Sequence, residues 1–170
     1  MAATEIRHPV AGDTRGVIDL VYRSPNLDNN SPYFYGMWVK EWWRSSAVAL
    51  EDGRVVGVLL GFVRPTAPDV YFAWQTCIDP ATRNSELATE LYDFVLDELC
   101  RDGVDRLEMT VNSDNRLVRL LLAKLARRYG SPVQNAILFP GEDLADGHYT
   151  EELRAIDLRA WTTSARLVQS

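Results

Sequence analysis

The chain has 170 residues, of which 46% are hydrophobic and 25% charged, a composition typical of one globular domain with a sizeable core. Its net charge of −6 argues against wholesale binding of nucleic acid, which favours basic surfaces. No apolar run approaches the length of a membrane span, and residues 1–10 contain no signal-peptide core. We therefore expect a single domain over residues 1–170 that works in the cytoplasm and binds no membrane.

The two cysteines, Cys77 and Cys100, fall in a predicted strand and a predicted helix. We expect buried or half-buried free thiols in a reducing compartment rather than a disulfide or a metal site. No spacing of cysteine and histidine supports a nucleophilic role for Cys77. The sequence therefore predicts no metal cofactor.

Apolar spacing and turn residues predict the elements of the first half of the chain. Asp13 can cap a helix whose inward face includes Val17 and Leu20. Asp52-Gly53 between two apolar runs predicts a β-hairpin. In chain order we expect a strand over residues 6–10, a helix over 15–23, an aromatic-rich helix over 33–43, and strands over 46–50 and 54–63.

The second half repeats a strand, a turn and a helix. Asp79-Pro80 ends an apolar strand over 70–78, and apolar residues three or four apart then predict a helix over 87–99. Later elements are a strand over 106–111, a helix over 116–129 capped by 112–115 and ended by Gly130, and strands over 133–139 and 152–158. The order β-α-α-β-β-β-α-β-α-β-β implies an α/β fold with a mixed central sheet of about seven strands flanked by helices.

The turn before the helix 87–99 is the most informative stretch. A turn entering a helix offers backbone N–H groups to an anion, usually a phosphate. N-acetyltransferases of the GNAT superfamily carry Arg-Gly-x-Gly-x-Ala/Gly in this place, and the chain resembles them in frame but lacks both glycines. Glu86 would bring a negative charge close to a bound pyrophosphate, unless it points to solvent or pairs with Arg83. The turn reads Arg83-Asn84-Ser85-Glu86-Leu87-Ala88.

Five further segments extend the resemblance over most of the chain, to the L-2,4-diaminobutyrate acetyltransferases of ectoine biosynthesis. The resemblance implies the GNAT fold and an N-acyltransferase that acts on a primary amine. It does not fix the substrate, because one fold hosts many functions. The segments are LDNNSPY (27–33), the hairpin with VG (56–57), GF (61–62) and RP (64–65), FAWQTCIDP (72–80), LEMTV with DN (107–111 and 114–115), and GHYTEEL (147–153).

The same resemblance implies where the donor thioester would bind. Backbone N–H groups around Gln75–Ile78 would stabilise the oxyanion that forms when an amine attacks the thioester. Many GNAT enzymes protonate the departing thiolate with a tyrosine, where this chain has Leu122. A thiolate can leave unprotonated, because the pKa of a thiol is about 8.5. The residues that would bind the cofactor are Cys77, Ile78, Arg83, Asn84, Ser85, Leu87, Ala88 and Asn115.

The identity of the donor stays open. Acetyl-CoA is the family's donor, and the loss of the glycines should weaken its binding. A phosphopantetheine thioester on an acyl carrier protein lacks the pyrophosphate of CoA and is the alternative. It would need a basic docking surface, since carrier proteins are usually acidic. Arg116, Arg119 and Arg127 form the candidate surface, although a solvated helix face is the more ordinary interpretation.

The acceptor side of the family pattern is retained. Trp74 would line the acceptor pocket, whereas its strand setting alone favours a place in the core. Asp28 could hold an ammonium group or form a turn. Tyr33 would lie beside Trp74 and Asp28. Glu108 either faces the site or pairs with arginine. The expected substrate-binding residues are Asp28, Asn30, Trp74, Gln75 and Glu108.

His148 is the candidate general base. Its neutral form is a proton acceptor near pH 7, and Glu151 could orient it or bind the ammonium group of the acceptor. The expected catalytic residues are His148, Glu151 and Tyr33. We expect an acyltransferase of secondary metabolism that works as a cytoplasmic homodimer. The alternative is a GNAT-fold binding protein or subunit that has lost CoA and catalysis.

Overall fold

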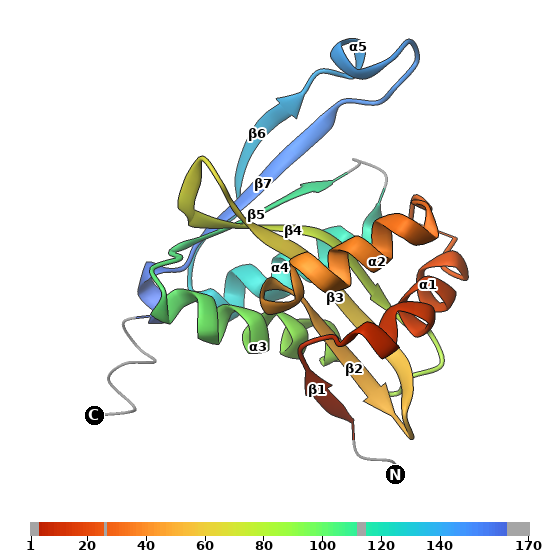
Figure 1. The fold of residues 1–170 in the computed structure, drawn as a ribbon. Coiled ribbons are helices and arrows are strands. Elements are labelled where there is room, and N and C mark those ends of the chain that lie inside the picture. The colour runs from red at the N-terminus through yellow and green to blue at the C-terminus, as the bar shows by residue number, and fades with distance from the viewer. Residues whose placement is uncertain (1–3, 26, 112–114, 163–170) are drawn as a thin grey trace. The chain divides into compact units, whose positions relative to one another are not determined.

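The computed structural model describes residues 4–25, 27–111 and 115–162, which fall into two compact units (Figure 1). Unit 1 comprises Met1–Phe62 and Ala73–Asp102, and unit 2 comprises Val63–Phe72 and Gly103–Ser170. The strands are β1 (Glu5–Arg7), β2 (Ala47–Glu51), β3 (Arg54–Arg64), β4 (Ala67–Ile78), β5 (Arg106–Val111), β6 (Gln134–Phe139) and β7 (Glu151–Asp157), and they follow the sheet order β1-β2-β3-β4-β5-β7-β6. The predicted α/β class with seven strands and flanking helices is confirmed, whereas the single domain over residues 1–170 stays a prediction.

Unit 1 contains an antiparallel sheet built around the predicted hairpin. β1 (Glu5–Arg7) pairs with β2 (Ala47–Glu51), and β2 pairs with β3 (Arg54–Arg64). Asp52 and Gly53 have φ values of 50° and 76°, the two left-handed residues that a tight hairpin turn requires. β4 (Ala67–Ile78) follows, and its residues 73–78 belong to this unit.

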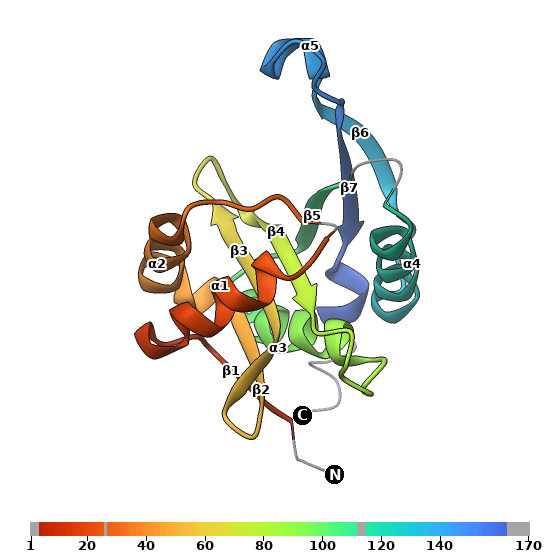
Figure 2. The ribbon, with the colours of Figure 1, turned by 90° about the vertical axis from the view of Figure 1, so that its right-hand side faces the viewer.

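Helices cover both faces of the unit 1 sheet. α1 (Thr14–Tyr22) and α2 (Pro32–Glu41) pack on one face and α3 (Leu87–Arg101) on the other (Figures 1 and 2). Gly57 lies on the α3 face, where an added Cβ would come within 3.3 Å of Leu91. The 3-10 helices η1 (Ala11–Asp13) and η2 (Trp43–Ser45) precede α1 and follow α2. The core beneath α1 and α2 includes Val17, Leu20, Val21, Tyr35, Trp38, Val48, Val58, Leu60 and Cys77.

Asp13 stands directly before α1, as expected, but the expected hydrogen bond from its side chain to the helix is wrong. The Asp13 carboxylate accepts from Arg7 at 2.7 and 2.9 Å and from the Val10 backbone N–H at 2.7 Å, and it makes no capping bond to α1. Asp13 also ends η1 in a helical conformation, which turns its side chain back toward the preceding residues. A local sequence pattern did not predict this competing partner.

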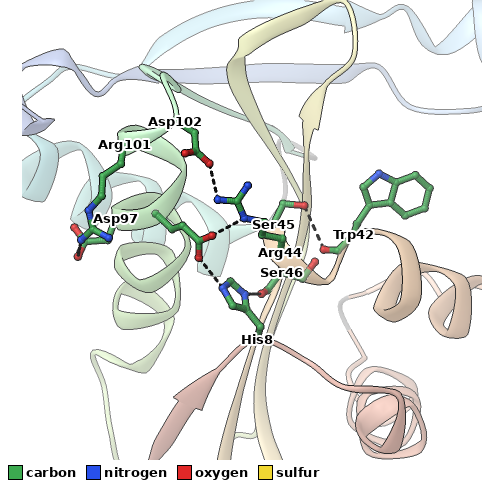
Figure 3. A network of polar contacts seen from close by, with 9 residues as sticks. His8, Trp42, Arg44, Ser45, Ser46, Asp97, Arg101 and Asp102 are labelled. Carbon is green, nitrogen blue, oxygen red and sulfur yellow. Dashed lines mark hydrogen bonds and ion pairs between the residues drawn. The ribbon is translucent and has the colours of Figure 1, made fainter.

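A polar network joins the end of β1 to η2 and α3 (Figure 3). His8 Nδ1 lies 2.9 Å from the carbonyl oxygen of Ser46, and His8 Nε2 lies 2.9 Å from a carboxylate oxygen of Glu98. Arg44 donates to the other Glu98 oxygen at 2.5 Å and to Asp102 at 2.7 Å. Both partners of the His8 ring are acceptors, so the protonated imidazolium satisfies the network in full.

Removing the centre of this network should destabilise unit 1. The hydrogen bond from His8, followed by that from Arg44, holds the pKa of Glu98 below its ordinary value. The carboxylate therefore contributes stability that is present above its unfolded pKa and is lost as the pH falls through the folded pKa. We expect Glu98→Gln to lower the free energy of unfolding at neutral pH by about 1 kcal/mol, since a third of the side chain is exposed.

Urea unfolding at several pH values measures this effect. Asp97→Asn is the matched control, because Asp97 lies on the same helix in an exposed pair with Arg101 at 3.4 Å. The control should unfold like the wild type. Equal stability of Glu98→Gln and the wild type at every pH would contradict a stabilising role of the network.

Unit 2 contains three antiparallel strands of the sheet order given above. β7 (Glu151–Asp157) lies between β5 (Arg106–Val111) and β6 (Gln134–Phe139), and it pairs antiparallel with both. α4 (Arg116–Tyr129) packs against β7 through Leu122, Leu125 and Tyr129 (Figure 2). Asn115 caps α4 by accepting from the Val118 N–H, and Gly130 ends it with a φ of 68°. Residues 112–114 of the expected cap lie outside the described residues.

The connection between β6 and β7 contains α5 (Gly141–Leu144), which the sequence did not predict (Figure 1). Cys77 and Cys100 are both buried, as expected, and no disulfide joins them. Among the described residues, no group of three or more His, Cys, Asp and Glu side chains could hold a metal ion. None of the helices in that part of the chain is long and apolar enough to cross a bilayer.

Candidate functional site

Trp74 stands on β4 as an aromatic wall of unit 1. Its side chain is 46% exposed, so it is not a closed core residue. The Trp74 ring packs on Trp38 and Phe34 of α2, with centroid distances of 5.6 and 6.2 Å. Tryptophan faces attract cations, so a half-exposed indole braced from behind suits the ammonium group of an amine. The aromatic spacing of residues 33–43 was the sequence signal for this bracing.

The loop that contains Asp28 is fixed to the strand residue next to Trp74. Gln75 Nε2 donates to the Asp28 carbonyl oxygen at 2.9 Å, and Gln75 itself is buried. Asp28 itself is exposed on this loop. Unit 1 therefore holds the backbone of Asp28 against Gln75, the residue that follows Trp74 on β4, and the acceptor role of these residues stays a prediction.

Tyr33 and Asn30 lie at the start of α2. Ser31 caps this helix by accepting from the Phe34 N–H at 3.2 Å, and Tyr33 follows in the first turn with 77% of its surface exposed. Asn30 uses its backbone instead of its side chain, since its carbonyl accepts from Tyr22 at 2.7 Å. The exposed Tyr33 side chain can therefore meet a ligand, whereas the backbone hydrogen bonds of Asn30 position the loop.

The turn 83–88 has formed, but it uses several of its own donors. The Glu86 N–H donates to Asn84 Oδ1 at 2.9 Å, and the Leu87 N–H donates to the Asn84 carbonyl at 3.3 Å. The Asn84 amide donates in turn to Glu90 at 2.8 Å. Two backbone donors that an anion at this helix start would use are therefore already engaged.

A carboxylate also sits at this helix start. The Thr89 hydroxyl donates to the Glu86 carbonyl at 2.7 Å and lies 3.4 Å from a Glu86 carboxylate oxygen. Arg83 is exposed and has no ion pair among the described residues, so the structure does not pair it with Glu86. Neither Asn84 nor Glu86 has a positive φ. Missing glycines therefore matter here through the added side chains and charge, not through backbone strain.

His148 and Glu151 lie in unit 2, around the start of β7. His148 Nδ1 lies 2.7 Å from the Tyr149 carbonyl oxygen. A carbonyl only accepts, so Nδ1 carries the proton and the neutral ring keeps its lone pair on Nε2. His148 is exposed, and within the described residues Nε2 has no partner. This tautomer is the one that a general base needs.

A tight turn holds His148 in place. Gly147 has a φ of 76°, which glycine adopts without strain. Gly141 is packed so closely that an added Cβ would lie 2.0 Å from the His148 carbonyl oxygen. The His148 N–H donates to Ala145 at 3.0 Å. The two glycines thus fix the backbone that carries His148, and Glu151 begins β7 three residues later.

The remaining predicted residues have structural partners. Glu108 is buried in unit 2, where its two carboxylate oxygens contact Arg106 at 2.8 Å and Arg64 at 3.1 Å. Of the two alternatives for Glu108, the structure contains the pairing with arginine. Cys77 and Leu87 are buried, Ile78 and Ala88 are half-buried, and Ser85 is exposed. Leu122 lies on the buried face of α4.

Comparisons with known proteins identify the family of this chain. Residues 17–126 match the Acetyltransferase (GNAT) family. The L-2,4-diaminobutyric acid acetyltransferase of Nocardia farcinica is 34% identical over 151 residues, which cover 89% of this chain and 78% of that protein. The protein of the same name from Halomonas elongata is 35% identical over 149 residues, covering 87% and 78%.

Solved structures show the same fold. The diaminobutyrate acetyltransferase EctA from Paenibacillus lautus, in complex with L-2,4-diaminobutyric acid and coenzyme A, superposes with a TM-score of 0.85 at 27% identity, covering 92% of this chain and 96% of that one. Ard1 from Thermoplasma volcanium has a TM-score of 0.72 at 20% identity, covering 92% and 99%, and supports the fold alone.

Proposed function

Because this chain belongs to the GNAT acetyltransferase family, we propose that it transfers an acetyl group from acetyl-CoA to a primary amine of L-2,4-diaminobutyrate or a closely similar diamino acid. It is a GNAT-type N-acetyltransferase. The observation that carries the choice of acceptor is the tether between the Asp28 loop and Gln75, beside the half-exposed Trp74. The tether holds the loop that carries Asp28 to the strand residue next to Trp74, and a carboxylate and an indole face are both groups that attract an ammonium group.

The proposed reaction is a direct transfer. His148 Nε2 takes a proton from the ammonium group, and the amine nitrogen attacks the carbonyl carbon of the thioester. Backbone N–H groups around Gln75–Ile78 stabilise the oxyanion. The C–N bond forms, the C–S bond breaks, and the thiolate leaves and takes up a proton. Asp28, Tyr33 and Trp74 hold the acceptor, while Glu151 orients His148 or binds the second amine.

A thermal-shift panel tests the two binding sites separately. A ligand that binds only the folded protein raises its melting temperature. L-2,4-Diaminobutyrate alone should stabilise the protein, and a monoamine of similar size should do so less. Acetyl-CoA should stabilise it weakly. No shift with any amine or with acetyl-CoA would favour the alternative, a GNAT-fold binding protein without catalysis, which the enzyme names of the relatives do not favour.

Restoring the glycines should tighten CoA binding. Glu86 adds a negative charge to the turn, and the Asn84 side chain accepts the hydrogen bond of the Glu86 N–H, which is then not available to a phosphate. We expect Asn84→Gly combined with Glu86→Gly to lower the Kd of CoA by at least about tenfold, or about 1.4 kcal/mol. Calorimetry measures the change, and Glu86→Gln, which removes the charge alone, should recover part of it. Tight wild-type binding that the double variant leaves unchanged would show that the turn tolerates Glu86.

An acyl carrier protein is the second candidate donor, and α4 is the observation that favours it. α4 has five basic residues and no acidic one in a chain of net charge −6. Arg116, Arg119 and Arg127 are exposed, have no ion pair among the described residues, and flank Leu120, which is 54% exposed. Arg119 lies three residues and Arg127 eleven residues after Arg116, close to one and three helical turns, so the three lie on one helix face. Such a face is complementary to an acidic carrier.

Donor kinetics separate the two candidates. Acetyl-CoA, acetyl-pantetheine and an acetyl-loaded acidic acyl carrier protein are compared as donors to L-2,4-diaminobutyrate. If the carrier docks on α4, the rate with the loaded carrier should exceed the rate with acetyl-pantetheine. Arg116→Glu or Arg119→Glu should remove this advantage, whereas Arg15→Glu, a substitution at an exposed residue of α1, should keep it. Equal losses with acetyl-CoA would assign the face to CoA instead.

We further propose that the protein is a cytoplasmic homodimer. Analytical ultracentrifugation tests the oligomeric state.

A further inference from the structure

We infer that Tyr35 is a positioning residue that sets acceptor specificity, because its buried hydroxyl fixes the loop 28–30 to β4. Tyr35 is fully buried on α2, and no sequence motif assigned it a role. Its hydroxyl accepts from the Asn30 N–H at 3.3 Å and donates to Gln75 Oε1 at 3.2 Å. The inference rests on the proposed function, since it concerns the loop that carries Asp28.

The hydrogen bonds form a continuous chain. Gln75 Oε1 accepts a hydrogen bond from the Tyr35 hydroxyl, and Gln75 Nε2 donates to the Asp28 carbonyl at 2.9 Å. The two bonds together fix the orientation of the Gln75 amide. Tyr22 donates to the Asn30 carbonyl at 2.7 Å from α1. Tyr35 thus engages the backbone of Asn30 directly and that of Asp28 through Gln75. We call Tyr22, Tyr35 and Gln75 the loop clamp.

The loop clamp lies next to the aromatic wall. Gln75 follows Trp74 directly on β4, and Tyr35 follows Phe34, whose ring packs on Trp74. A hydrogen-bond network with a buried centre has one well-satisfied arrangement, so we expect it to fix the distance between the backbone that carries Asp28 and the Trp74 ring. A fixed separation favours one acceptor length over others. The loop clamp should therefore select L-2,4-diaminobutyrate over longer diamino acids such as ornithine and lysine.

Tyr35→Phe removes the hydroxyl and keeps the ring in the core. We expect the KM for L-2,4-diaminobutyrate to rise by about tenfold and its advantage over ornithine to shrink, with kcat at saturating amine and the KM for acetyl-CoA unchanged. Tyr92→Phe is the control, because Tyr92 is also buried and its hydroxyl lies 2.9 Å from Thr76, with no bond to the loop. An unchanged amine KM in Tyr35→Phe would overturn the inference.

A double-mutant cycle shows whether Tyr35 acts through Asp28. If it does, Tyr35→Phe should raise the amine KM much less in an Asp28→Asn background than in the wild type. Independent effects of the two substitutions would mean that Tyr35 is merely structural, and would overturn the inference.

Hydrogen exchange separates the loop clamp from the proposed function. The Asn30 amide, which donates to Tyr35, should exchange faster in Tyr35→Phe and stay protected in Tyr92→Phe. Unchanged exchange at Asn30 would overturn the loop clamp whatever the enzyme acetylates. If the exchange changes as expected while the wild type acetylates no diamino acid, the clamp stands as the structure of the loop and the proposed function fails.

Discussion

Trp74→Ala should abolish measurable amine binding while the protein remains folded. Trp74 is 46% exposed, so its loss opens no closed cavity in the core. Its indole face would hold the ammonium group, and a desolvated cation–π contact is worth about 2 kcal/mol, or roughly thirtyfold in affinity. The substitution also removes the apolar contacts of the indole ring with the acceptor, which lowers the affinity further. Calorimetry with L-2,4-diaminobutyrate measures the affinity, and circular dichroism checks the fold.

Trp42→Ala is the matched control for this substitution. Trp42 is 43% exposed and packs on Trp38 at 5.0 Å, within the same aromatic cluster, but it lies beyond α2 and not on β4. The control should keep its amine affinity. A folded Trp74→Ala variant that binds the amine as tightly as the wild type would remove Trp74 from the acceptor site.

His148→Ala should reduce turnover by about a hundredfold or more at neutral pH, the ordinary contribution of a general base. The Nδ1–H group of His148 donates to the Tyr149 carbonyl, so Nε2 is the nitrogen that accepts the proton of the amine. At high pH more of the amine is already neutral, and the variant should lose less activity. The pH profile of kcat/KM measures the difference.

A structural role for His148 predicts another profile. If the side chain only supports the turn 145–150, its removal should cost the same fraction of activity at neutral and at high pH. Equal losses would therefore contradict the general-base assignment. Glu151→Gln should act in the same direction as His148→Ala if Glu151 orients the imidazole, because the amide keeps the shape and loses the charge.

Elements with local signals at both ends could be predicted from the sequence. The helix over 116–129 was predicted with its bounds, since Asn115 and Gly130 carry the signals that begin and end a helix. Asp52-Gly53 fixed the hairpin for the same reason. Asp13 was misjudged because its partner Arg7 competes for the carboxylate, and α5 lies in a loop with no apolar period.

The candidate site was predicted from motifs, while its supporting contacts were not. Trp74, Asp28 and His148 are marked by their sequence context. Tyr35 looks like one apolar position of α2, and its partner Gln75 lies 40 residues away in sequence. Side-chain hydrogen bonds of this kind depend on how α2 packs on β4, which no local period encodes. The contacts of Asn84 and Glu86 likewise required the folded turn.

The central claim is acetyl transfer to a diamino acid, and the product of one reaction tests it most directly. Wild-type protein is incubated with acetyl-CoA and L-2,4-diaminobutyrate at saturating concentrations, and the products are followed by mass spectrometry and by titration of free thiol. The proposed function predicts a diaminobutyrate that gains the mass of one acetyl group, with one thiol released for each product. Thioester hydrolysis without acetylated amine, or no thiol release at all, would contradict it.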